Sequence, residues 1–228
     1  MSLWSRIAEA VSRLVARGES LLAFFERRRP PERSVAFTIA VVSLGAKMAK
    51  ADGLVRSAEV AAFRRVFRID PKDEADAARV FNLARQDVAG FATYARRIAR
   101  MFQDQPRMRE DVLEGLFQIA LADGRYHDDE EAFLRTVAEI FEIPAAVFDG
   151  IEARHLEGVR EDPWQVLGVP RSAPLAEVKA RWRELVRAHH PDQVIARGLP
   201  PETVSLANAR ISAINRAWEE ISQRAKAA

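Results

Sequence analysis

The chain has 228 residues, 48% hydrophobic and 30% charged, which is typical of a soluble globular protein with one large or two small domains. It contains no cysteine, which excludes disulfides, thiolate metal sites and cysteine nucleophiles. The formal net charge is only +2, and residues 34–159 carry 17 basic and 21 acidic side chains, so no nucleic-acid partner is expected.

The first predicted element is a basic amphipathic helix within residues 1–33. Its arginines occupy much of the polar face, and Pro30-Pro31 ends it. Three roles fit this pattern: docking on the next domain, self-association with a second copy, or peripheral contact with an anionic membrane surface. The apolar positions near one face are Leu3, Ile7, Val11, Leu14, Leu21, Leu22 and Phe25.

The next segment, residues 34–46, is the most apolar run in the chain and has 13 residues. A membrane-spanning helix needs roughly 20 apolar residues, so this run predicts a buried core helix and no transmembrane span. We therefore expect a cytoplasmic protein, either free or held peripherally at the inner membrane by its N-terminal helix.

Residues 34–155 show helical periodicity almost throughout, and they contain an internal repeat. Residues 47–70 align with residues 118–141 at an offset of 71 positions, and each copy places Ala-Asp-Gly between two apolar helices. The aligned acidic residues are Asp52 with Asp123 and Glu59 with Glu130. Such residues either cap the helix that follows or, together, ligate a divalent cation. Capping is the simpler interpretation because the loops lack the EF-hand pattern.

This repeat resembles the TerB-like domain, an all-helical module named for tellurite resistance proteins. The resemblance rests on the two Ala-Asp-Gly loops and the glutamates that follow them. It implies a helical bundle over 34–155 and a divalent-metal site formed by Asp52, Glu59, Asp123 and Glu130.

Residues 161–193 predict a short helix, a turn and a longer helix that ends at two adjacent histidines. Lys179, Arg183 and Arg187 recur every fourth residue and form a basic stripe. His189 and His190 point about 100° apart on a helix, so they cannot both ligate one metal ion. Pro191 disfavours helix at His190, and no nucleophile has a recognisable partner, so a catalytic site is not indicated.

The C-terminal region, 160–228, resembles the J domain of DnaJ co-chaperones, and its order after a TerB-like domain resembles the DjlA-type co-chaperones. The signature tripeptide is His190-Pro191-Asp192. The loop after it is longer than in many J domains, and Glu184 stands where many members have a base. The matching helix positions are Asp162, Pro163, Trp164, Leu167, Gly168, Lys179, Trp182, Arg183, Leu185, Ile211, Ile214, Asn215, Ala217 and Trp218.

The resemblance implies an all-α protein in which a TerB-like bundle precedes a small J-domain helical hairpin. It implies a co-chaperone that docks on DnaK through His190, Pro191, Asp192, Lys179, Arg183 and Arg187 and stimulates ATP hydrolysis by DnaK. The chain itself would be no enzyme and would need no cofactor, and the TerB-like domain would select unfolded or specific clients, or a location. The alternative is a metal-binding or stress-sensing TerB-like protein with the J domain as its effector.

Overall fold

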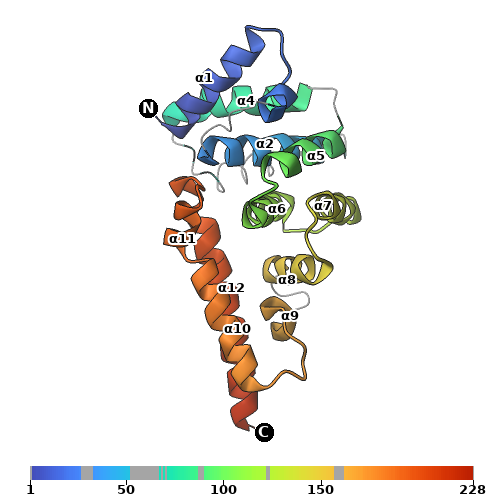
Figure 1. Cartoon of the computed structure of the whole chain (residues 1–228), viewed down its shortest axis with the longest axis vertical. Helices are drawn as coiled ribbons and strands as arrows, with labels where there is room; N and C mark the ends of the chain where they lie inside the picture. The colour runs from blue at the N-terminus through green and yellow to red at the C-terminus, as the bar shows by residue number, and fades with distance from the viewer. Residues whose placement is uncertain are drawn as a thin grey trace. The chain divides into compact units, whose positions relative to one another are not determined.

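The computed structural model describes residues 2–26, 33–51, 67, 69, 71–86, 90–121, 124–156 and 162–227. Every regular element in these ranges is a helix, which confirms the all-α fold class (Figure 1). The chain divides into two compact units, and each is described by itself. Unit 1 comprises Met1–Ile143 with Gly198–Glu202, and unit 2 comprises Pro144–Arg197 with Thr203–Ala228.

Unit 1 is built around α2, the buried core helix predicted from the apolar run at 34–46. This helix packs against α1, α4, α5 and α6. A Cβ atom at Gly115 would lie 3.2 Å from Val41, so the glycine lets α2 and α6 approach closely. The helices of the unit are α1 (Leu3–Val15), η1 (Leu21–Glu26), α2 (Arg33–Ala51), η2 (Pro71–Asp73), α4 (Glu74–Gln86), α5 (Phe91–Met101), α6 (Pro106–Ala120) and α7 (Asp128–Ile140).

The N-terminal helix α1 buries its apolar face inside unit 1. The hydroxyl of Ser2 caps the helix by accepting a hydrogen bond from the backbone N–H of Ser5 at 3.1 Å. The helix packs on α4, α2 and η1, and Trp4 meets Phe67 edge to face with ring centroids 6.0 Å apart. Of the three predicted roles, docking on the neighbouring domain is the one that accounts for this buried face.

A membrane-crossing helix was not expected from the sequence. Within the part of the chain that the structure describes, no helix has both the length and the apolar content that a bilayer crossing requires.

Unit 2 contains a long helical hairpin, in which α10 and α12 run antiparallel side by side (Figure 1). The short α9 packs against both, and Leu167, Val178 and Ile214 are fully buried between the three helices. Asp162 caps α9 by accepting the N–H of Trp164 at 3.2 Å, as the Asp-Pro start predicts. The helices of the unit are α8 (Ala145–His155), α9 (Pro163–Leu167), α10 (Leu175–Ala188), α11 (Pro191–Ala196) and α12 (Val204–Ala227). The short turn η4 (Pro201–Thr203) precedes α12, and the boundary between the units falls within it.

Helix α8 packs on α9 and α12, so it belongs to unit 2. Ala153 is part of the same buried cluster as Leu167 and Ile214, and Gly150 faces the carbonyl oxygen of Gln165, which a Cβ would approach to 3.4 Å. The division between the units lies between Ile143 and Pro144. The domain ranges 34–155 and 160–228 remain predictions from the sequence.

Candidate functional site

The His-Pro-Asp tripeptide forms the connection between α10 and α11. His190 has an extended backbone (φ −58°, ψ 137°), which is the conformation that the following proline favours. Pro191 is the first residue of α11, a position where its missing N–H costs nothing. The imidazole of His190 accepts the N–H of Asp192 through Nδ1 at 3.3 Å and so caps α11.

Two side chains of this tripeptide face solvent. The His190 side chain is 52% exposed and the Asp192 side chain 85%, while the preceding His189 is buried. His190 Nδ1 and an oxygen of Asp192 are 3.6 Å apart, so an imidazole and a carboxylate lie together at the start of α11. His190 and Asp192 therefore lie at the surface, at the connection between α10 and α11.

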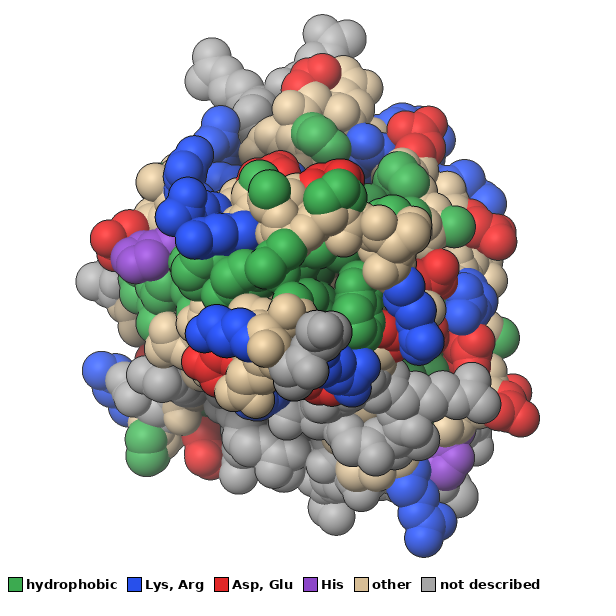
Figure 2. Space-filling model, turned by 90° about the horizontal axis from the view of Figure 1, so that it is seen from below, with side chains coloured by type: hydrophobic (Ala, Val, Ile, Leu, Met, Phe, Trp, Pro, Cys, Tyr) green, Lys and Arg blue, Asp and Glu red, His purple; other side chains and the backbone are tan. Residues whose placement is uncertain are grey.

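The predicted basic stripe lies on the exposed side of α10. The side chains of Lys179, Arg183 and Arg187 are exposed, and none of them makes a hydrogen bond or ion pair with the described residues. Seen from the lower end of Figure 1, the Lys and Arg side chains stand in separate groups and form no continuous basic field (Figure 2). The three bases are therefore available to an acidic partner surface.

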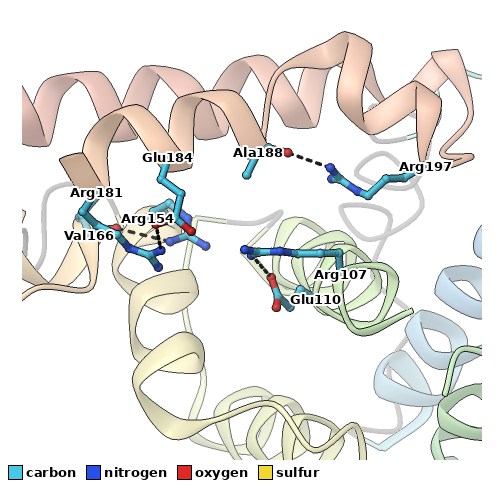
Figure 3. A network of polar contacts seen from close by, with 8 residues as sticks. All are labelled: Arg107, Glu110, Arg154, Val166, Arg181, Glu184, Ala188 and Arg197. Carbon is cyan, nitrogen blue, oxygen red and sulfur yellow. Dashed lines mark hydrogen bonds and ion pairs between the residues drawn. The ribbon is translucent and has the colours of Figure 1, made fainter. Parts of the chain in front are cut away.

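Glu184 pairs with Arg181, a base outside the stripe. Its carboxylate pairs with Arg181 one turn away at 2.8 Å (Figure 3). Arg181 also donates from Nε to the carbonyl oxygen of Leu167 at 3.2 Å, which ties α10 to the end of α9. Because this acid and this base neutralise each other, the charge of the stripe is left to the other three side chains.

Three tryptophans lie at the edge of the hairpin core. Trp164, Trp182 and Trp218 are only partly buried and pack against the buried cluster from outside. Trp182 and Trp218 stack with centroids 5.3 Å apart and planes at 15°. The indole N–H of Trp182 donates to Oδ1 of Asn215 at 2.9 Å. An indole carries a polar N–H, so it suits a position at the edge of a core where that group finds a partner.

The segment after the tripeptide was predicted to be a long loop, but its first part is the helix α11. Val194, a residue of α11, is buried. Arg197 donates from Nη1 to the carbonyl oxygen of Ala188 at 2.8 Å, and this bond joins the end of α11 to the end of α10 (Figure 3). The available signal was local: proline at the first position and aspartate in the first turn are both favourable helix starts.

Of the four residues predicted to bind metal, the structure describes only Glu130. Asp52, Glu59 and Asp123 lie outside the described residues. Glu130 is buried at the start of α7, and its Oε2 accepts the N–H of His127 at 3.0 Å in a capping box. Across the described ranges, no three His, Asp or Glu side chains are grouped so as to hold a metal ion. Capping thus accounts for Glu130, and the four-residue metal site stays a prediction.

Two family models match the chain. The model "Tellurite resistance protein TerB" covers residues 38–153, and the model "DnaJ domain" covers residues 162–228. The TerB model therefore includes most of α8, although α8 packs within unit 2.

Curated relatives also match the chain. A protein of Coxiella burnetii named "Co-chaperone protein DjlA" is 27% identical over 194 residues, which is 76% of this chain and 72% of the relative. Its namesake in Photobacterium profundum is 27% identical over 221 residues, 86% of this chain and 80% of the relative. The Escherichia coli K12 protein of that name is 32% identical over 136 residues, about half of each chain (49% and 50%). No solved structure matches the chain.

Proposed function

Because the chain belongs to the family of proteins that carry a TerB domain followed by a C-terminal DnaJ domain, we propose that it is a co-chaperone that docks on DnaK and stimulates ATP hydrolysis by DnaK. The observation that carries this proposal is the exposed His190-Pro191-Asp192 turn beside three cations that have no partner among the described residues.

The basic stripe supplies the attraction in this mechanism. Lys179, Arg183 and Arg187 are spaced one helical turn apart, about 6 Å along the axis of α10. Uncommitted cations in such a row accelerate and orient the encounter with an acidic surface, and their effect is screened by salt. We propose that this acidic surface belongs to DnaK.

The tripeptide supplies the effect on hydrolysis. Its shape is fixed by the His190 cap and by the bond from Arg197 to Ala188, so little conformational freedom is lost on binding. A rigid surface stimulates an ATPase when it binds the hydrolysis-competent state of the partner more tightly than the other states. The bond-breaking chemistry stays with DnaK, and this chain acts as a selective ligand and not as an enzyme.

Unit 1, which contains most of the residues matched by the TerB model, has a different proposed role. We propose that unit 1 selects the client or the location, since the proposed DnaK contact lies wholly on α10 and α11 of unit 2. The N-terminal helix is part of that unit, and its buried apolar face argues for a structural role ahead of membrane contact.

The test is single-turnover ATP hydrolysis by DnaK, with and without the full chain. We expect the wild type to accelerate hydrolysis and His190→Gln to abolish the acceleration. Helical content and melting temperature should barely change, because the lost cap is exposed and long and is worth about 1 kcal/mol or less. A His190→Gln protein that accelerates hydrolysis like the wild type would contradict the proposal.

A further inference from the structure

An apolar side chain stands beside the tripeptide on the outer face of α11. Ile195 is 41% exposed, and among the described residues the other large apolar side chains exposed to this degree are Val15 and Leu175. Ile195 follows Asp192 by three positions. Residues at this spacing lie on one helical face, with Cβ atoms about 5–6 Å apart. We call Asp192 and Ile195 the outer face of α11.

The orientation of α11 is fixed by its surroundings. A helix of six residues has no stability of its own in water, so contacts with the rest of the unit must hold it. Val194 is buried, α11 packs against α12 and α10, and Arg197 bonds to the carbonyl oxygen of Ala188. Ile195 is therefore held outward by a helix whose other side is anchored.

A protein that contacts Asp192 on this face must also cover Ile195. The two side chains are neighbours, and the short anchored helix cannot turn one away from the partner while presenting the other. We propose that Ile195 is a partner-binding residue that adds an apolar contact to the DnaK interface, next to the charged contacts of the tripeptide and the basic stripe. This inference rests on the proposed function, which supplies the partner.

The contribution of Ile195 differs in kind from that of the stripe. A cation in the stripe acts through steering, so its removal matters less at high salt. An apolar contact depends on area removed from water, so its loss is felt equally at low and high ionic strength. For a side chain that is already partly buried, truncation is expected to weaken binding roughly 3- to 10-fold.

The experiment measures DnaK ATPase stimulation against the concentration of the full chain, at low and high salt. Ile195→Ser is expected to raise the concentration for half-maximal stimulation roughly 3- to 10-fold at both salt levels, with the maximum retained. Leu175→Ser is the matched control, because Leu175 is 43% exposed and lies at the opposite end of α10 from the tripeptide. It should behave as the wild type. Ile195→Leu should restore most of the affinity.

The outcomes separate the two proposals. If the wild type stimulates DnaK and His190→Gln does not, but Ile195→Ser titrates like the wild type, the role of Ile195 is overturned and the co-chaperone function stands. If Ile195→Ser lowers the melting temperature in step with its loss of stimulation, Ile195 is structural and the inference is also overturned. A wild-type chain that never stimulates DnaK would overturn the proposed function itself.

Discussion

His189 and His190 are adjacent in the chain, yet one imidazole is buried and the other caps α11 at the surface. The helical spacing of about 100° between neighbours already predicts that they point apart. The sequence also predicts the basic stripe, because the three bases recur every fourth residue. It does not predict that Arg181 neutralises Glu184, since that pairing depends on which rotamers the packing against α9 allows.

Arg181 and Arg183 lie two positions apart on α10 and are expected to differ in role. Arg183 has no partner among the described residues, so Arg183→Ala should weaken DnaK stimulation at low salt, by an amount that shrinks as salt is added. Arg181 bonds to Leu167 and Glu184, so Arg181→Ala should cost about 1 kcal/mol of stability and leave binding nearly intact. ATPase titrations and thermal melts of both variants measure the contrast. Equal effects of the two substitutions on binding would contradict it.

At the scale of elements, the periodicity of apolar residues predicts where helices form, but it does not predict which other helices they pack against. The sequence places α8 in the predicted TerB-like domain, 34–155, and the TerB family model also reaches residue 153. The structure packs α8 on α9 and α12, with Ala153 inside the hairpin core. Periodicity shows which face of a helix is apolar, but it does not show which unit covers that face. For the same reason α11 was missed: six residues are too few to display a period.

Helix α8 offers a direct test of this packing. Ala153→Glu would place a longer, charged side chain among the apolar residues of the buried cluster of unit 2, where burial of a charge is costly. We expect a loss of roughly 2–4 kcal/mol in the stability of the J-domain unit, seen as a lower midpoint in chemical denaturation. Ala146→Glu is the control, because Ala146 is exposed on the same helix. Similar midpoints for the two variants would show that α8 is not anchored on the hairpin.

At the scale of the whole molecule, composition and motifs were sufficient for the fold class and for the order of the two family domains. Both predictions depend on local features of the sequence, which are the helical periodicity of apolar residues, the residues at helix ends and the His-Pro-Asp tripeptide. The metal site could not be decided in this way, because acidic residues at a helix start serve equally as caps and as ligands. In the structure Glu130 caps α7, and the metal site stays a prediction.

The first helix is expected to be indispensable to unit 1. Its buried side chains include Leu3, Trp4, Ile7, Val11 and Leu14. At about 1.5–3 kcal/mol each, their burial is comparable with the whole stability of a domain, roughly 5–15 kcal/mol. Deleting residues 1–26 should therefore unfold unit 1 or leave it binding a hydrophobic dye, as followed by dye fluorescence and circular dichroism. A truncated protein that melts like the full chain would contradict the packing of α1.

The stacked indoles of Trp182 and Trp218 have an optical consequence. Three of the four tryptophans in the chain lie in unit 2, and these two are nearly parallel at 5.3 Å between centroids, one on each arm of the hairpin. Transition dipoles that close exchange excitation, so we expect the pair to add a split signal to the far-ultraviolet circular dichroism that a lone indole does not produce. That signal should weaken steeply when α10 and α12 separate, because the coupling falls with the cube of the distance between the indoles. The separation of α10, which bears the basic stripe, from α12 can therefore be followed through the native tryptophan pair, without an added label.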